Sequence, residues 1–202
     1  MIDEMRHTRA LRALAPLGGR WQPLGHGKEG IVLTDRLRVC KLFDGWIDKA
    51  ASEIEPTLDR VQLVIDRCAG TSWLPPQPRL GRIGQIHALF YGYETTEPFG
   101  GGCERQFVDM LCALRTIGLM YFGFRTSSFR VGPRGLLLVD LGVDMRPYEA
   151  ARWRHNLERA FLLARHGHRS DLKNMQQRAL VGEAVPELDG LASFLRQCEE
   201  PR

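Results

Sequence analysis

The stretch GHGKEGIV at residues 25–32 is followed, after a short polar segment, by RVCKLF at residues 38–43. The first stretch fits the pattern G-x-G-x-x-G-x-V. Glycines let backbone N–H groups come close to phosphates, but a dinucleotide-binding turn of this pattern leads into a helix. Here β-type residues follow, then a turn and a second strand, so residues 25–43 are predicted to form a glycine-rich β-hairpin. On this pattern alone, a hairpin that binds no ligand is an equally good interpretation.

The second strand of this hairpin carries one lysine, Lys41, among apolar residues. A lysine that is turned inward needs a counter-charge, and the helical periodicity of residues 47–68 offers Glu53 and Glu55. Glu53 is the preferred partner, because Pro56 disturbs the helix backbone next to Glu55, which stays the alternative. The competing interpretation is that Lys41 points to solvent, as most lysines do.

A third segment, LLLVDLG at residues 136–142, ends an apolar strand on Asp140 and is followed by a glycine that lets the chain turn away. The alternative is a strand end that is capped by an Asp-containing turn. Between the second and third segments, EPFGGG at residues 97–102 is the best linker candidate. The chain is therefore expected to have a β-rich half with one main helix, a linker, and a mainly helical half.

In this order, the three segments resemble the protein-kinase superfamily over about residues 20–145, and in particular its compact bacterial branch, which includes lipopolysaccharide-core kinases. The resemblance implies an α+β, protein-kinase-like fold with two lobes. Its parts would be an N-terminal helical extension (1–19), a β-rich N-lobe with one main helix (20–96), a hinge or linker (97–102) and a truncated, mainly helical C-lobe (103–202).

The same resemblance implies that the ligands are ATP and Mg²⁺. The residues that would contact the nucleotide are Gly25, Gly27, Gly30, Val32, Lys41 and Asp140. Glu53 would pair with Lys41, and the adenine base would rest near residues 94–98. Asp140 would also bind the metal, with a weaker contribution from Ser128.

The catalytic loop departs from the family pattern, which is H-R-D followed by four residues and Asn. Counting back from the strand at residues 129–131 puts Ser128 at the Asn position and Gly123 at the position of the catalytic Asp. Glycine has no side chain to orient a hydroxyl, and serine is a weaker Mg²⁺ ligand than an amide oxygen. Loss of a positioned acid–base group costs about 10²- to 10⁴-fold in rate. Arg125 matches the Lys or Arg that the family has two residues after the Asp.

These departures leave more than one function open. The favoured hypothesis is a pseudokinase, a kinase fold that keeps a nucleotide-phosphate site and acts as a regulator or scaffold. The alternative is an active, atypical ATP-dependent phosphotransferase that acts on a protein, sugar or lipopolysaccharide-core hydroxyl, with Asp144 or Asp109 replacing the missing acid. A minor third hypothesis is an interaction domain that binds no nucleotide.

Composition sets further limits on the partners and the location of the chain. Its 202 residues carry a net charge of +4 without long like-charge runs, so nucleic acid is not expected as a partner. The N-terminus lacks the apolar segment of a secretory signal, and no apolar run approaches the roughly 20 residues of a membrane helix. A cytoplasmic bacterial protein is expected.

Arginines are frequent in the helical half, at positions 152, 154, 159, 165 and 169. The simpler interpretation is a solvated helix face, and the alternative is a contact with a membrane or with an anionic partner, either a protein or a glycolipid. After this stretch, Ser170 is expected to cap a further helix that runs through Leu180.

Overall fold

The computed structural model describes residues 2–167 and 172–199. The chain divides into two compact units, Met1–Thr95 and Thr96–Arg202. Both units contain helices and antiparallel strands, so the fold is α+β. In the part of the chain that the structure describes, no helix is both long enough and apolar enough to span a bilayer.

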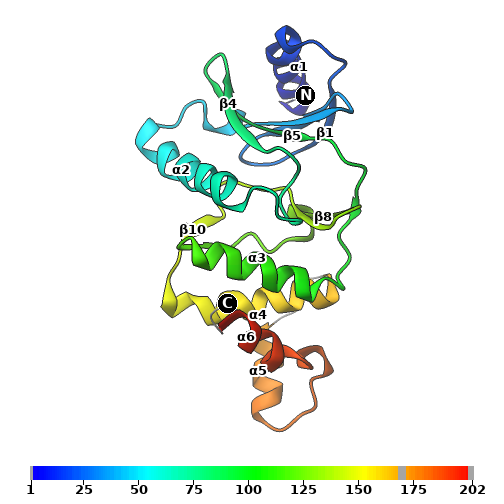
Figure 1. Ribbon diagram of the computed structural model, residues 1–202, viewed down its shortest axis with the longest axis vertical. Helices are drawn as coiled ribbons and strands as arrows, with labels where there is room; N and C mark the ends of the chain where they lie inside the picture. The colour runs from blue at the N-terminus through cyan, green and yellow to red at the C-terminus, as the bar shows by residue number, and fades with distance from the viewer. Residues whose placement is uncertain (1, 168–171, 200–202) are drawn as a thin grey trace. The chain divides into compact units, whose positions relative to one another are not determined.

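The first unit is built on a five-stranded antiparallel sheet with the strand order β1-β2-β3-β5-β4 (Figure 1). The strands are β1 (Gln22–His26), β2 (Ile31–Thr34), β3 (Arg38–Leu42), β4 (Arg79–Ile83) and β5 (Ile86–Gly92). The helices are α1 (Ile2–Leu14) and α2 (Ala51–Cys68), with short 3-10 turns η1 (Ala15–Leu17) and η2 (Asp44–Trp46). The segment predicted as one hairpin, residues 25–43, takes part in two, because the glycine-rich residues turn between β1 and β2, and β2 then pairs with β3.

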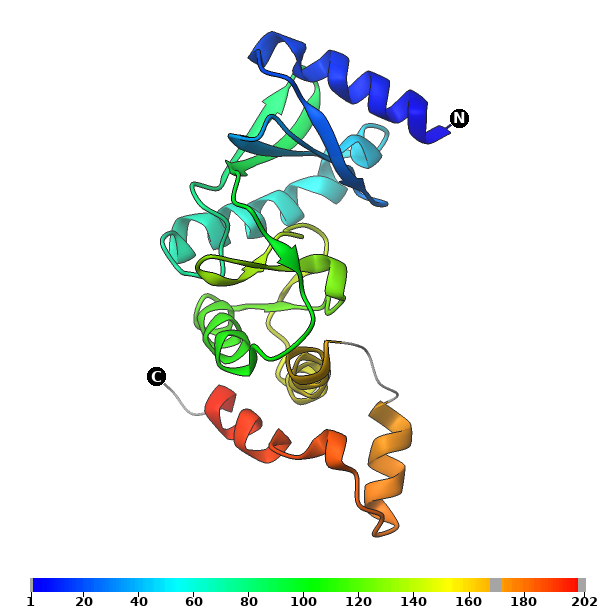
Figure 2. The same ribbon diagram turned by 90° about the vertical axis from the view of Figure 1, so that its right-hand side faces the viewer.

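Alternation along the strands decides what each face of this sheet packs against. Leu33, Cys40 and Leu42 belong to a buried cluster that includes Ala10 and Leu14 of α1. Helices α1 and α2 lie on opposite sides of the sheet (Figure 2). Because Lys41 alternates with Cys40 and Leu42, it points to the face opposite the α1 cluster.

Helix α2 is one continuous helix of 18 residues, although Pro56 lies inside it. Pro56 is in the second turn of the helix, so its missing N–H removes only the bond to the carbonyl of Ser52. The helix begins at Ala51 and not near residue 47, because the preceding residues continue the η2 turn, in which Lys49 N donates to Trp46 O at 3.1 Å.

The second unit combines two small sheets with four helices among its described residues. One sheet has the order β6-β8-β9, and the other pairs β10 with β7. The strands are β6 (Glu97–Pro98), β7 (Leu119–Tyr121), β8 (Phe129–Gly132), β9 (Gly135–Leu138) and β10 (Met145–Pro147). The helices are α3 (Glu104–Thr116), α4 (Ala150–His166), α5 (Leu172–Leu180) and α6 (Leu191–Glu199), with 3-10 turns η3 (Thr126–Ser128) and η4 (Pro186–Leu188).

The predicted linker and the predicted helix cap Ser170 can each be compared with this unit. The first two residues of the predicted linker form β6, which pairs with β8 and is part of the second unit. The predicted capping residue Ser170 and the arginine at position 169 lie outside the described residues, and α5 is described from Leu172 onward.

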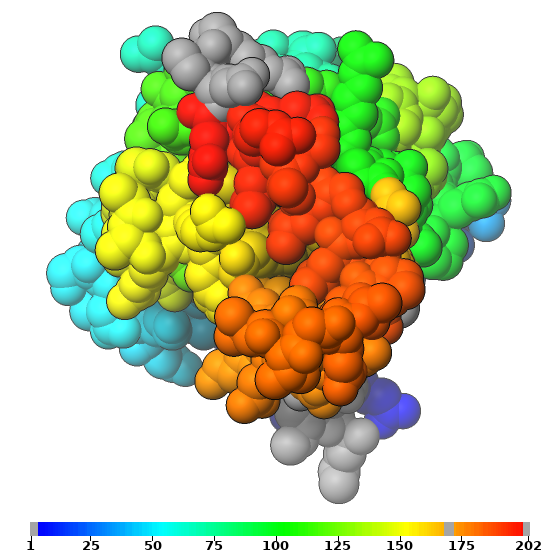
Figure 3. Space-filling view, turned by 90° about the horizontal axis from the view of Figure 1, so that it is seen from below, coloured from blue at the N-terminus to red at the C-terminus, as the bar shows by residue number. Residues whose placement is uncertain are grey.

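Aromatic rings fill the core of the second unit. The ring of Phe107, on α3, lies 4.8 Å from that of Phe129 and 5.7 Å from that of Phe99. A separate aromatic contact joins α4 to α6, where Phe161 packs edge-on against Phe194 with the ring centres 5.5 Å apart. Figure 3 shows this side, where the α5-to-α6 segment (orange to red) lies against α4 (yellow). The ring of Phe124 lies 6.3 Å from that of Phe107, so the aromatic core also holds the loop before β8 against α3.

Candidate functional site

The glycine-rich turn of the first unit joins β1 to β2. Gly27 N donates to Gly30 O at 2.8 Å, which closes the turn. A side chain at position 30 would collide with the backbone carbonyl of Leu42, so the fold itself requires a glycine there. A Cβ added at Gly25 or Gly27 would meet no atom within 4 Å. Packing therefore explains one of the three glycines, and the other two leave open space above the hairpin.

Lys41 is buried on β3, with only 4% of its surface exposed. Its Nζ lies 3.4 Å from Glu29 Oε2 and 5.0 Å from the ring centre of Phe43. The interpretation that Lys41 points to solvent is therefore wrong. A buried ammonium of this kind is held by its ion pair and by the aromatic face.

The described hydrogen bonds of Glu53, the predicted partner of Lys41, are to Ala50. Its Oε1 accepts a hydrogen bond from Ala50 N at 3.4 Å, and its own N–H donates to Ala50 O at 3.0 Å, so the residue closes the first turn of α2. The carboxylate that the structure places on Lys41 is Glu29, which occupies a variable position of the glycine pattern and was missed for that reason. A Lys41–Glu53 pair stays a prediction.

In the second unit, two residues predicted as metal ligands lie side by side. Ser128 is buried, and its Oγ donates to Asp140 Oδ2 at 3.3 Å. The β8–β9 hairpin brings Ser128 and Asp140 together. It pairs Phe129 with Leu138, and just beyond this pair Val139 N donates to Ser128 O at 3.0 Å. Hydroxyl and carboxylate oxygens are suitable ligands for Mg²⁺. Within residues 2–167 and 172–199, no three His, Cys, Asp or Glu side chains are grouped so as to hold a metal ion.

The space beside Gly123 is occupied by two other side chains. A Cβ at position 123 would collide with Asp144 Oδ2 and with the hydroxyl of Tyr121. Arg125 Nη2 lies 2.7 Å from the same Asp144 oxygen, while the Tyr121 hydroxyl donates to the carbonyl of Asp140 at 3.3 Å. A carboxylate therefore lies where the side chain of residue 123 would begin. The sequence offered two replacement acids, Asp144 and Asp109. The carboxylate beside Gly123 belongs to Asp144, whereas Asp109 lies on α3.

Electrostatics fixes the protonation state of two members of this cluster, Tyr121 and Arg125. Burial, and then the nearby charge of Asp140, raise the pKa of Tyr121 well above its usual range, so its hydroxyl stays a hydrogen-bond donor. The hydrogen bond to Asp144 raises the pKa of Arg125. The Arg125 guanidinium is therefore a permanent cation next to the Asp144 carboxylate.

No protein-family model and no curated protein sequence matches the chain. Among solved structures, it is similar to the PknI kinase domain of M. tuberculosis, with 12% identity and a TM-score of 0.47 over 89% of this chain and 94% of that one. It is also similar to WbdD, with 15% identity and a TM-score of 0.49 over 91% of this chain and 46% of the WbdD chain. Because both TM-scores lie below 0.5, the function of this chain has to be inferred from its own residues and not from these likenesses.

Proposed function

We propose that this chain has a protein-kinase-like fold and is an ATP-dependent phosphotransferase in which Asp144 takes the part of the acid that is missing at position 123. The observation that carries the proposal is the position of the Asp144 carboxylate, in the space next to the Cα of Gly123. The sequence alone favoured a pseudokinase because glycine cannot orient a hydroxyl, and the Asp144 carboxylate supports the active alternative by offering an acid at that place.

Each unit, taken by itself, has residues that suit a part of the proposed chemistry. Buried Lys41 suits the phosphates of a nucleotide as a fixed cation, and the absence of side chains at Gly25 and Gly27 lets a phosphate come close to the backbone. Asp140 and Ser128 offer adjacent oxygens for Mg²⁺. When bound, the metal would neutralise charge on the transferred phosphoryl group.

Asp144 would orient the acceptor hydroxyl. In the transfer, the acceptor oxygen forms a bond to the γ-phosphorus of ATP, the bond from that phosphorus to the ADP oxygen breaks, and the acceptor proton passes to the Asp144 carboxylate. Positioning matters more than basicity in phosphoryl transfer, because its transition state is loose. The ion pair with Arg125 at 2.7 Å therefore does not disqualify Asp144, since it fixes the carboxylate in place.

The test measures Mg²⁺-dependent ATP binding by thermal shift and ATP turnover to ADP, in the wild type and in Lys41→Ala, Asp140→Ala and Asp144→Asn. We expect Lys41→Ala and Asp140→Ala to lose binding. Asp144→Asn should bind ATP like the wild type but turn it over about 10²- to 10⁴-fold more slowly. Asp109→Asn, on α3, is the matched control and should keep both properties. A wild-type chain that does not bind ATP with Mg²⁺ contradicts the proposal.

The second candidate is a pseudokinase that binds nucleotide and acts through a partner. It is favoured by Gly123 itself and by the ion pair that already engages Asp144. Its signature in the same experiment is ATP binding that depends on Lys41 and Asp140, together with an equally low turnover in the wild type and in Asp144→Asn. On this candidate, nucleotide binding would serve regulation or scaffolding.

A further inference from the structure

A pocket of about 590 Å³ lies in the second unit, beside the loop at residues 122–128. Most of its lining is charged. The arginines are Arg125, Arg146, Arg152 and Arg159, and the acids are Asp144 and Glu149. With four guanidinium groups against two carboxylates, the formal charge of the pocket is +2. Such a concave, cationic surface attracts anions.

Both acids of the pocket position an arginine. Asp144 Oδ2 lies 2.7 Å from Arg125, and Glu149 Oε2 lies 3.0 Å from Arg152 Nε. The two arginine side chains nevertheless stay 54% and 65% exposed. Since a guanidinium has five N–H donors, each of these arginines keeps donors for a ligand while the acid restricts its movement.

The pocket arginines come from three separate elements. Arg125 lies in the loop before η3, Arg146 on β10, and Arg152 and Arg159 on α4, seven residues apart and thus on one helix face. The other described arginines of the basic stretch do not line this pocket. Arg154 pairs with Glu158 on its own helix at 3.6 Å, and Arg165 pairs with Glu104 of α3 at 3.2 Å. The basic stretch therefore divides by position and not by ion pairing, since Arg152 is itself paired with Glu149.

We propose that this pocket binds the phosphate group of a phosphorylated small molecule, and that this molecule is the acceptor of the transfer. Guanidinium groups match phosphate oxygens in a two-pronged geometry. The volume lies within the range of about 300–1,000 Å³ of small-molecule sites, so it accommodates an organic part as well as the phosphate. Asp144 lines the same pocket and would meet a hydroxyl of that molecule. The inference of phosphate binding depends only on the pocket arginines, whereas the inference that the molecule is the acceptor rests on the proposed phosphotransferase function.

The test is a calorimetric titration with glucose 6-phosphate, glycerol 3-phosphate, inorganic phosphate and uncharged glucose. We expect both phosphate esters to bind more tightly than inorganic phosphate, and glucose not to bind. Arg152→Gln and Arg159→Gln should each weaken ester binding by about 10- to 100-fold, the effect of losing a charge-assisted hydrogen bond. Arg154→Gln, on the same helix but outside the pocket, is the matched control and should bind like the wild type.

Several outcomes would overturn the inference. They are the absence of ester binding, ester binding no tighter than that of inorganic phosphate, and an equal loss in Arg154→Gln. If Arg159→Gln also lowers the melting temperature, Arg152→Gln decides, because its side chain is 65% exposed. Ester binding that depends on Arg152 in a protein without ATP turnover would refute the proposed phosphotransferase and leave the phosphate site standing.

Discussion

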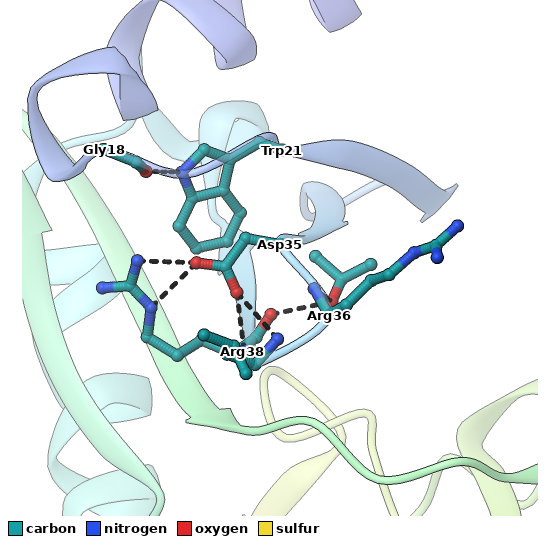
Figure 4. Close-up of polar contacts among 7 residues, drawn as sticks. Gly18, Trp21, Asp35, Arg36 and Arg38 are labelled. Carbon is teal, nitrogen blue, oxygen red and sulfur yellow. Dashed lines mark hydrogen bonds and ion pairs between the residues drawn. The ribbon is translucent and has the colours of Figure 1, made fainter.

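Among single residues, Asp35 holds the turn between β2 and β3 (Figure 4). Its Oδ1 accepts hydrogen bonds from the backbone N–H groups of Leu37 at 3.0 Å and Arg38 at 2.7 Å. Its Oδ2 accepts two from the Arg38 guanidinium, at 3.0 and 2.6 Å. Arg38 in turn covers the ring of Trp21 at 5.2 Å. The carboxylate thus compensates for Arg36, which has a φ of 69° in the left-handed region.

Replacing Asp35 by Asn should lower the free energy of unfolding by about 1–3 kcal/mol at pH 7, because the charged acceptor is lost. Burial raises the pKa of Asp35, but the hydrogen bonds from the Arg38 side chain and from the Arg38 and Leu37 backbone together bring it below its usual value. The stabilisation is therefore complete above the unfolded pKa of about 3.9 and is lost as the pH falls through the lower folded pKa.

Urea unfolding of the wild type and Asp35→Asn at pH 7 and near pH 3 checks this expectation. The difference between the two proteins should be largest at pH 7 and should shrink in acid. Asp59→Asn, an exposed position on α2, is the control and should change stability by less than about 0.5 kcal/mol. A difference of the same size at both pH values would contradict a stabilising role for the Asp35 charge.

At the level of secondary-structure elements, the β7–β10 pair builds the candidate site. The register sets Met145 opposite Tyr121, and Phe122 N donates to Asp144 O at 2.9 Å just beyond the paired strands. This backbone bond, together with the ion pair to Arg125, fixes Asp144 beside Gly123. Two strands of three residues each therefore decide which acid reaches the altered loop.

Gly123→Ala should destabilise the second unit by about 1–3 kcal/mol, because the new methyl group has to displace Tyr121 or Asp144. Gly123→Asp should lower ATP turnover even though it restores the acid of the family pattern, because the larger side chain evicts Asp144. Thermal unfolding and ATP turnover measure the two effects. Gly25→Ala, where a Cβ meets no atom within 4 Å, is the stability control. Faster turnover in Gly123→Asp would show that Asp144 is not the orienting acid.

In the molecule as a whole, each of the two units has a hydrophobic core of its own. The first is centred on the sheet residues that pack against α1, and the second on the aromatic rings around Phe129. Units of this kind are expected to fold independently.

Expressed separately, residues 1–95 and 96–202 should therefore each unfold in a cooperative urea transition, with a smaller slope than the full chain because less surface becomes exposed. A fragment of residues 1–75 lacks β4 and β5, and β5 lies inside the sheet next to β3. It is the matched control and should show no cooperative transition. If residues 1–95 behave like this control, the first unit is not self-sufficient.

Local pattern was enough to predict several elements. The glycine-rich hairpin, the helix that contains Pro56 and the hairpin leading to Asp140 follow from periodicity and turn residues, which act between near neighbours in the chain. The same reasoning could not identify Glu29 as the partner of Lys41. That contact depends on how the turn of one hairpin folds back over the next strand, and no spacing rule encodes it.

Residue type and local order were sufficient to establish that the chain is α+β, that Lys41 belongs to an apolar strand and Asp140 follows one, and that position 123 carries no acid. The folded chain was needed to reveal that Asp144 fills the space beside Gly123 and that arginines from a loop, a strand and a helix line one pocket. Such arrangements depend on the pairing of β7 with β10 and on the packing of α4, which bring together residues far apart in the chain.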